Sequence, residues 1–269
     1  MGRIAPTIDY IMEDPREATR LELKVDARAW VQKYVSHRVG VDAEVLCVGC
    51  GPGAILREVL ALDPSLKGVG LDISAERIEE AKKRNRGIPQ MEFVRGDAQA
   101  MRLASNRFDL VYSRMLLEYL KDKEGAVEEM ARVCKPGGRV LLQDLDGQLL
   151  WHYPEDPVVQ RTAEKVVAAL SATGFDPFVG RKLFSFAHKA GLKNIDVQIE
   201  PYHLIAGKIS PEMLKHWELK MEIVGPQLTR LLGSESEARE QAHRFLEYLR
   251  RPDTLTYSTV FTVTGEKAA

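Results

Sequence analysis

Between residues 43 and 146 the chain alternates short apolar runs with amphipathic segments, and this alternation restricts its fold more than any other feature. The apolar runs predict strands at 44–48, 67–71, 91–94, 108–112 and 139–145. The amphipathic segments predict helices at 53–62, 74–85 and 124–134. Such alternation builds a parallel sheet with helices on both faces, and right-handed crossovers bring the strand-to-helix loops to one edge. The sequence therefore predicts a doubly wound α/β fold with a ligand site at that edge.

The segments outside residues 43–146 are expected to add helices and strands to this alternating region. Residues 1–42 form a helical lead-in, in which Asp14-Pro15-Arg16-Glu17 has the form of a capping box. Residues 147–250 begin with a polar and aromatic loop at 148–157 and then supply helices, with one strand near 195–205. Residues 255–265 alternate as a last strand. Because no linker separates these parts, we expect residues 1–269 to form a single domain.

Charge and cysteine content exclude several classes of protein. The chain has 38 basic and 39 acidic residues, so no net charge draws it to nucleic acid or to an anionic membrane. Neither a signal-peptide pattern nor an apolar run of membrane-spanning length is visible, and we expect a cytoplasmic protein. Three cysteines are too few for a disulfide framework, and no second pair follows Cys47-x-x-Cys50. We therefore expect no metal site.

The strongest local motif is a strand that leads into a glycine-rich turn. Residues 45–54 read VLCVGCGPGA, and the turn opens the helix that follows. Glycines let the backbone approach a ligand closely and adopt positive φ. Because Gly49, Gly51 and Ala54 also fit the loose G-x-G-x-x-A pattern of dinucleotide sites, the motif alone indicates a phosphate or nucleoside ligand without identifying it.

A carboxylate follows the second expected strand. Asp72 ends the run Gly68–Leu71, some twenty residues beyond the glycine turn. A carboxylate in this position can accept hydrogen bonds from both hydroxyls of a ribose. The turn and the acid together favour a nucleotide or nucleoside, and they leave NAD and S-adenosylmethionine as alternatives.

Three further motifs separate these alternatives. A carboxylate follows the third strand in FVRGDA (93–98), the fourth strand FDLVYS (108–113) runs into RMLLEYL, and the turn KPGG (135–138) precedes the fifth strand. In this order and spacing the motifs resemble the signature of class I S-adenosylmethionine-dependent methyltransferases over about residues 43–146. The resemblance implies a seven-stranded, mostly parallel sheet whose last strand, here 255–265, is antiparallel.

The resemblance also implies a cofactor site for S-adenosylmethionine. Gly49 and Gly51, in one turn with Cys50 and Gly53, would line the methionine and ribose portions of the cofactor. Asp72 would hold the ribose hydroxyls. Further implied contacts are Ile73 on the adenine, Asp97 and Ala98 at the adenine amino edge, and Ser113 and Arg114 near the sulfonium and amino-acid portion.

One residue departs from the family pattern. Family members usually carry an acid two residues before the first glycine, where this chain has Cys47. That acid helps to order the turn and the amino group of the cofactor, so another group is expected to substitute. Tyr10, Arg20 and Lys24 of the lead-in are candidates, and Arg20 could pair with the cofactor carboxylate.

The segment after the fifth strand is the expected place for contacts with a methyl acceptor. It carries Asp144, Asp146 and His152, and His152 is the first candidate for a general base. The two aspartates are the alternatives, although either could cap the turn instead. The aromatic and Met-rich helices that follow favour a small or medium-sized organic acceptor, modified on O, N or C. Leu-rich helices within 209–250 could equally serve a homo-oligomer interface.

Two other functions remain alternatives at the level of sequence. An NAD(P)-dependent oxidoreductase would explain the glycine turn and Asp72, but not the motifs at 96–98 and 135–138. A regulatory protein could bind the cofactor without turnover, and the Cys47 departure adds weight to that alternative.

Overall fold

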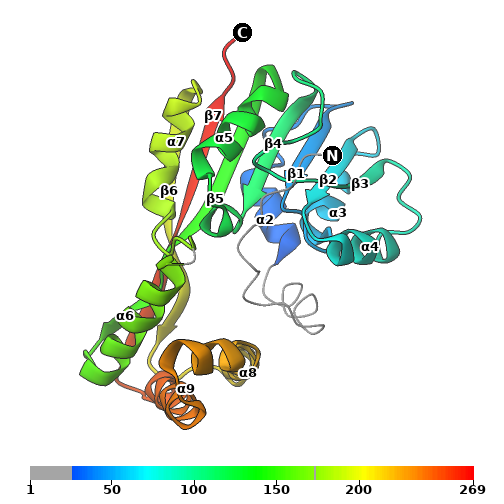
Figure 1. Ribbon diagram of the computed structural model, residues 1–269. Helices are drawn as coiled ribbons and strands as arrows, with labels where there is room; N and C mark the ends of the chain where they lie inside the picture. Colours follow the sequence, from blue (N-terminus) through cyan, green and yellow to red (C-terminus); the bar gives the residue numbers. More distant parts are fainter. Residues whose placement is uncertain (1–25, 173) are drawn as a thin grey trace.

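The computed structural model describes residues 26–172 and 174–269, which fold around one seven-stranded sheet (Figure 1). The strands are β1 (Glu44–Val48), β2 (Lys67–Asp72), β3 (Met91–Arg95), β4 (Phe108–Arg114), β5 (Cys134–Tyr153), β6 (Lys193–Ala206) and β7 (Leu255–Glu266). Their order across the sheet is β3-β2-β1-β4-β5-β7-β6. Strands β1 to β5 pair in parallel, whereas β7 is antiparallel to both β5 and β6. The predicted fold class, including the antiparallel last strand, is confirmed.

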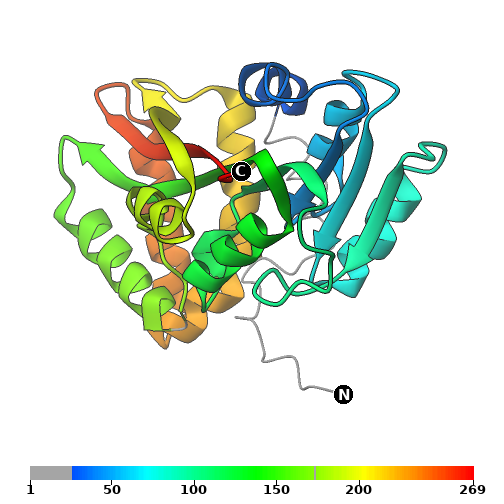
Figure 2. The same cartoon turned by 90° about the horizontal axis from the view of Figure 1, so that it is seen from above.

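The helices pack on both faces of the sheet. They are α2 (Ala27–Tyr34), α3 (Ala54–Leu60), α4 (Ala75–Arg84), α5 (Lys123–Val133), α6 (Pro157–Ala172), α7 (Leu183–Lys189), α8 (Pro211–Leu232) and α9 (Glu235–Arg250). Buried side chains of α2, α3 and α4 pack on one face of the sheet, and those of α5 and α7 pack on the other. Figure 2 shows α2 on the opposite side of the sheet from α5 and α7.

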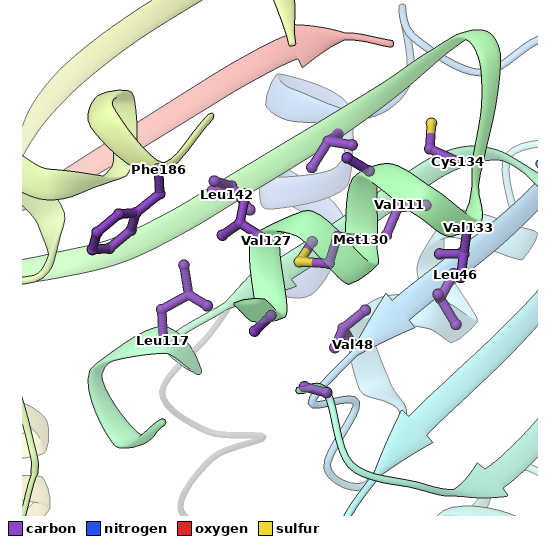
Figure 3. Packing of buried hydrophobic residues seen from close by; sticks show 14 of the residues in the cluster. Leu46, Val48, Val111, Leu117, Val127, Met130, Val133, Cys134, Leu142 and Phe186 are labelled. Atoms are coloured by element: carbon purple, nitrogen blue, oxygen red, sulfur yellow. The ribbon is translucent and has the colours of Figure 1, made fainter. Parts of the chain in front are cut away.

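The main core lies between the sheet and α5. Leu46, Val111 and Leu142 come from three neighbouring strands, and Met130 reaches them from α5 (Figure 3). All four side chains are fully buried. The near-continuous apolar composition of these strands follows from their position, because a central parallel strand is covered on both faces.

Strands β5, β6 and β7 extend beyond this core into a second lobe, which we call the cap (α6, α8 and α9; Figure 1). The cap has its own apolar cluster, made by Val159, Ile205, Ile209, Trp217, Tyr248 and Leu249. Ser210 caps α8 by accepting from the amide of Met213, and Ser234 caps α9 by accepting from that of Glu237. The predicted helical region at 209–250 is therefore two helices.

The prediction of a loop at 148–157 was wrong over its first half. Strand β5 continues to Tyr153, and after an irregularity in the register Trp151 pairs with Tyr257 and His152 with Thr256. Aromatic residues favour strands when a neighbouring strand is available, and here β7 is that neighbour. The pairing partner lies about 100 residues away, so local composition could not reveal it.

Candidate functional site

The glycine-rich turn lies where the order of the strands reverses. Strand β1 pairs with β2 on one side and with β4 on the other, and α3 and α5, which follow β1 and β4, pack on opposite faces. In open α/β sheets ligands bind at such a switch point, outside the carboxyl ends of the strands. The turn begins there, with the amides of Gly49 and Cys50 donating to the carbonyl of Leu71 over 2.8 and 3.0 Å.

The three glycines of the turn differ in what surrounds them. Gly49, Gly51 and Gly53 have φ of 72°, 50° and 83°, in the left-handed region that favours glycine. A Cβ at Gly49 would lie 2.9 Å from Leu116, and one at Gly53 would lie 2.7 Å from Phe93. A Cβ at Gly51 would have no heavy atom within 4 Å. Gly49 and Gly53 therefore serve internal packing, whereas Gly51 presents its backbone to open space.

Asp72, at the end of β2, connects the glycine turn to the start of α4. Its carboxylate accepts from the amide of Gly51 over 2.9 Å and from that of Ser74 over 3.0 Å. Ser74 in turn caps α4, as the sequence predicted, by accepting from the amide of Arg77. A carboxylate has about four acceptor positions, so two remain for a ligand beside Gly51.

Asn85 is a supporting residue that the sequence did not indicate. Its buried side-chain amide donates to the carbonyl of Pro52 over 3.0 Å and to that of Ala81 over 2.7 Å. Arg57 donates to the Asn85 carbonyl oxygen over 3.1 Å. The glycine turn is thus tied to the end of α4. No local signal marks this role, because Asn85 reads as an ordinary helix-terminal residue.

Asp97 and Ala98 follow β3 at the same edge. Asp97 Oδ1 accepts from the backbone amide of Gln99 over 2.9 Å and from its side-chain amide over 3.1 Å. Ala98 is buried in the main core, and Ile73 accepts a hydrogen bond from Arg95 through its carbonyl. The structure therefore brings the carboxylates of Asp72 and Asp97 to the ends of adjacent strands.

The end of β4 belongs to a buried polar network centred on Gln143. Arg114 donates from Nε to the Gln143 side-chain oxygen over 3.1 Å and from its terminal nitrogen to the Tyr202 hydroxyl over 3.1 Å. Trp30 of α2 donates to the same Gln143 oxygen over 2.7 Å. Ser113, next to Arg114, is buried. The Arg114 guanidinium thus connects β4 to β5 and β6, and no sequence motif predicted this role of Gln143.

The carboxyl groups of Asp144 and Asp146, both within β5, already have hydrogen-bond partners in the protein. Asp144 is buried and accepts from the amides of Leu116, Glu118 and Leu145. Its burial and the nearby Glu118 carboxyl raise the pKa of Asp144 well above its usual range. Asp146, also buried, forms a bidentate pair with Arg181, whose Nε lies 2.9 Å from Oδ2. Both side chains therefore hold backbone segments in place.

The departure at Cys47 leaves no carboxylate in that part of β1. Cys47 is buried opposite Tyr112 in the β1–β4 register, and burial raises the pKa of its thiol to about 12. Burial also raises the pKa of Cys50 well above its usual range. Both thiols remain protonated and free, so the pair supplies neither a thiolate nor a disulfide. Tyr10, Arg20 and Lys24, the predicted substitutes for the acid, lie outside the described residues.

His152 faces the cap. Its Nδ1 lies 3.1 Å from the Thr256 hydroxyl, and its ring packs edge-on against Tyr248 at 5.2 Å. Its Nε2 is buried without a hydrogen-bond partner, and His152 lines a cavity between α6, α8 and α9. Burial lowers the pKa of His152, so the imidazole is neutral at pH 7.

Metal clusters and membrane-spanning helices are both absent from the described part of the chain. Residues 26–172 and 174–269 contain no group of three or more His, Cys, Asp or Glu side chains that could hold a metal ion. Within the same residues, none of the helices has the length and apolarity needed to cross a membrane.

Comparison with known proteins identifies this arrangement. Residues 46–142, from β1 into β5, match a family model described as a methyltransferase domain. This matched region belongs to the class I S-adenosylmethionine-dependent methyltransferases. The matched region holds the glycine turn, Asp72 and Asp97, and it ends before the cap begins.

Relatives of this chain are named as methyltransferases of different acceptors. It is 36% identical over 138 residues to a malonyl-acyl-carrier protein O-methyltransferase of Enterobacter lignolyticus, covering 51% of this chain and 48% of that protein. It is 35% identical over 112 residues to a sterol 24-C-methyltransferase of Aspergillus fumigatus, covering 40% of this chain and 29% of that protein. The chain thus spans less than half the length of either relative.

Solved structures share the fold of this methyltransferase beyond the matched region. Phosphoethanolamine N-methyltransferase 2 of Haemonchus contortus matches all of this chain and 62% of its own, with a TM-score of 0.63 at 15% identity. The [4+2]-cyclase SpnF matches over 100% of both chains, with a TM-score of 0.60 at 16% identity. At these identities the likeness concerns the fold alone.

Proposed function

We propose that this chain is an S-adenosylmethionine-dependent enzyme that methylates a small or medium-sized organic acceptor on O, N or C. The observation that carries the proposal is the turn at the β1–β4 switch point. There the backbone of Gly51 faces open space beside the Asp72 carboxylate. A polar, nucleoside-containing ligand fits this combination of an accessible backbone and a carboxylate with remaining acceptor capacity.

The residues at the sheet edge would hold the cofactor through three groups. Asp72 would accept from the ribose hydroxyls, Asp97 from the adenine amino group, and the turn at Gly49–Gly53 would contact the methionine portion. When bound, S-adenosylmethionine supplies an electrophilic methyl group on its sulfonium. The contribution of the protein is then to align the acceptor and to exclude water.

We propose His152 as the general base for an acceptor that enters with its proton. If Nδ1 donates to the Thr256 hydroxyl, Nε2 presents a lone pair to the cap cavity. The lowered pKa keeps this imidazole neutral, and therefore able to accept a proton, at pH 7. Asp144 and Asp146 are weaker candidates because their carboxyl oxygens already accept from backbone amides or Arg181.

A protein of this fold need not transfer methyl groups, because fold does not determine function. The likeness in fold to a [4+2]-cyclase, over the full length of both chains, illustrates this point. The test must therefore measure methyl transfer as well as cofactor binding. Balanced charge and the apolar cap support a small-molecule acceptor rather than a nucleic acid.

The first experiment is calorimetric titration of the protein with S-adenosylhomocysteine and, in parallel, with NADH. We expect the homocysteine compound to bind and NADH not to bind. Asp72→Asn should weaken binding about tenfold to hundredfold, because hydrogen bonds to a charged group contribute about 1.5–3 kcal/mol. Asp63→Asn is the matched control, because this half-buried carboxylate after α3 also accepts from a backbone amide, that of Ser65, but lies outside the glycine turn.

Turnover is then measured as the appearance of S-adenosylhomocysteine when S-adenosylmethionine is supplied with a panel of acceptors. Binding of NADH alone would overturn the methyltransferase proposal. Binding of the homocysteine compound without turnover on any acceptor class would favour a regulatory protein or a different reaction at the cap.

A further inference from the structure

The cap holds a partly open cavity of about 230 Å³, and all of its described lining residues except Tyr119 lie outside the matched methyltransferase region. Its wall is mainly apolar and comes from all three cap helices, with Val159, Val166 and Leu170 on α6, Met221 and Val224 on α8, and Phe245 on α9. A dry cavity of 150 Å³ holds one benzene molecule. A volume of 230 Å³ therefore suits a ligand of about two fused rings or ten carbons.

Three polar atoms interrupt this apolar wall. Trp217 Nε1, Gln227 Oε1 and His152 Nε2 each belong to a residue that lines the cavity, and each is buried without a hydrogen-bond partner. Buried polar atoms nearly always have partners, so these three atoms are paired by whatever occupies the cavity, water or a ligand that displaces it. The three residues come from α8 and β5, so no single helix end creates the pattern.

The chemistry of these atoms determines what the ligand must carry. The indole of Trp217 can only donate, so it requires an oxygen that accepts. The Gln227 oxygen accepts, and so does His152 Nε2 when Nδ1 donates to Thr256, so both require a donor such as a hydroxyl. One hydroxyl on the ligand can accept from Trp217 and donate to one of the two acceptors, Gln227 or His152, and a second donor on the ligand would satisfy the other.

The charge of the lining argues for a neutral ligand. Among the described lining residues, Lys220 is the only one with a permanent charge, and its ammonium lies 4.5 Å from the centroid of the Trp217 ring. An anion in this cavity would have to exchange water for a largely apolar wall, which is costly. A neutral hydroxylated compound avoids that cost.

We infer that the cap cavity binds a neutral, hydroxylated ring compound about the size of a naphthol. Tyr119, which follows β4 by one short turn, also lines the cavity, and its ring packs against Phe175 at 5.2 Å. The cavity thus borders the segment that leaves the cofactor edge of the sheet. The identification of this compound as the methyl acceptor rests on the proposed function, whereas its binding does not.

The test is equilibrium dialysis of the full-length protein against 2-naphthol, naphthalene and 2-naphthoate. We expect 2-naphthol to bind, naphthalene to bind at least threefold more weakly, and 2-naphthoate at least tenfold more weakly. Trp217→Phe and Gln227→Met should each weaken 2-naphthol about threefold to tenfold, the effect of one lost hydrogen bond. Neither should change the affinity for naphthalene, which has no oxygen. Trp151→Phe, at a half-exposed tryptophan outside the cavity, is the matched control.

Each contrary result has a distinct meaning. The inference is overturned if 2-naphthol does not bind, or if 2-naphthoate binds as tightly as 2-naphthol. Equal weakening of 2-naphthol and naphthalene by Trp217→Phe would show that the indole only supports packing. Titration of the same variants with S-adenosylhomocysteine verifies their folding. Naphthol binding without any homocysteine-compound binding would keep this inference and overturn the proposed function, and the reverse result would do the opposite.

Discussion

The core and the cap of this molecule differ in how closely their buried side chains pack and in whether their buried polar atoms have partners. In the core, Leu46, Val111 and Leu142 are completely buried between sheet and helices, and polar groups such as Asp144 are paired with backbone amides. In the cap, a smaller apolar cluster surrounds a cavity and three polar atoms without partners. The densely packed core fixes the backbone at the carboxyl ends of the parallel strands, where we propose that the cofactor binds. The cap has a cavity and polar atoms without partners, so it has room for a ligand.

Removing one fully buried leucine from each region tests whether the core and the cap differ in packing and whether they unfold together. Leu142→Ala should lower the free energy of unfolding by about 4 kcal/mol and Leu249→Ala by about 3 kcal/mol, because the cap can settle around the missing atoms. Since β5 and β7 run through both regions, both variants should melt in one transition. Calorimetry checks this expectation. Two transitions, with only one shifted by Leu249→Ala, would show that the cap is a separate domain and not part of the single domain expected from the sequence.

A second test concerns the function of the cap. His152→Gln should reduce kcat/KM about hundredfold if its imidazole is the base, the lower end of the usual contribution of general base catalysis. Burial lowers the pKa of His152, so the imidazole becomes protonated only below pH 6.5 and activity should fall on that acidic side. The measurement is the pH profile of kcat/KM for wild type and variant. An unchanged acidic limb in His152→Gln would assign the titration to another group.

The junction between the two regions provides a third test. Arg181→Ala leaves the buried Asp146 carboxylate with only the backbone amide of residue 181, and it should cost about 2 kcal/mol of stability. Arg239, whose ion pair with Glu235 is largely exposed, is the control, and its replacement by alanine should change stability by less than about 0.5 kcal/mol. Urea denaturation measures both. Equal effects would mean that solvent already screens the pair at Asp146.

The smallest effect on stability should come from the most open glycine of the cofactor edge. Gly51→Ala should cost about 1 kcal/mol because φ is 50° there, yet it should weaken S-adenosylhomocysteine binding about tenfold or more by filling the open space. Gly225→Ala, on α8 with nothing within 4 Å, is the control that should leave binding unchanged. Full binding by Gly51→Ala would move the cofactor away from this turn.

The core could be predicted from the sequence because its signals are local. The apolar runs, the glycine turn and the Ser74 cap are all encoded within a few residues, and each appears where the pattern indicated. The extension of β5 to Tyr153 was not predictable in this way, since it depends on pairing with β7. The roles of Asn85 and Gln143 were missed for the same reason: their partners are distant in sequence.

The residues of the candidate site also divide into those with a local sequence signal and those without one. Asp72, Asp97 and Gly51 were selected from motifs, and the structure brings them to one edge of the sheet. The roles of these residues in cofactor binding stay predictions. The cavity beside His152 had no motif, because its volume is set by how α6, α8 and α9 pack together, and neither helical periodicity nor composition determines that spacing.

The three strands that join core to cap also constrain how the cap can move. The pairing of β7 with β5 and with β6 reaches from Glu266 in the core to Leu255 in the cap, and between the two regions it is interrupted at Asp146–Trp151 on β5 and at Tyr202–Ile205 on β6. Bending between core and cap is therefore easiest at these two irregularities. Bending such a ribbon sharply would break ladder hydrogen bonds, whereas a small change in its twist would preserve them. The cavity between α6, α8 and α9 is partly open to solvent, so ligand entry does not require these three helices to separate.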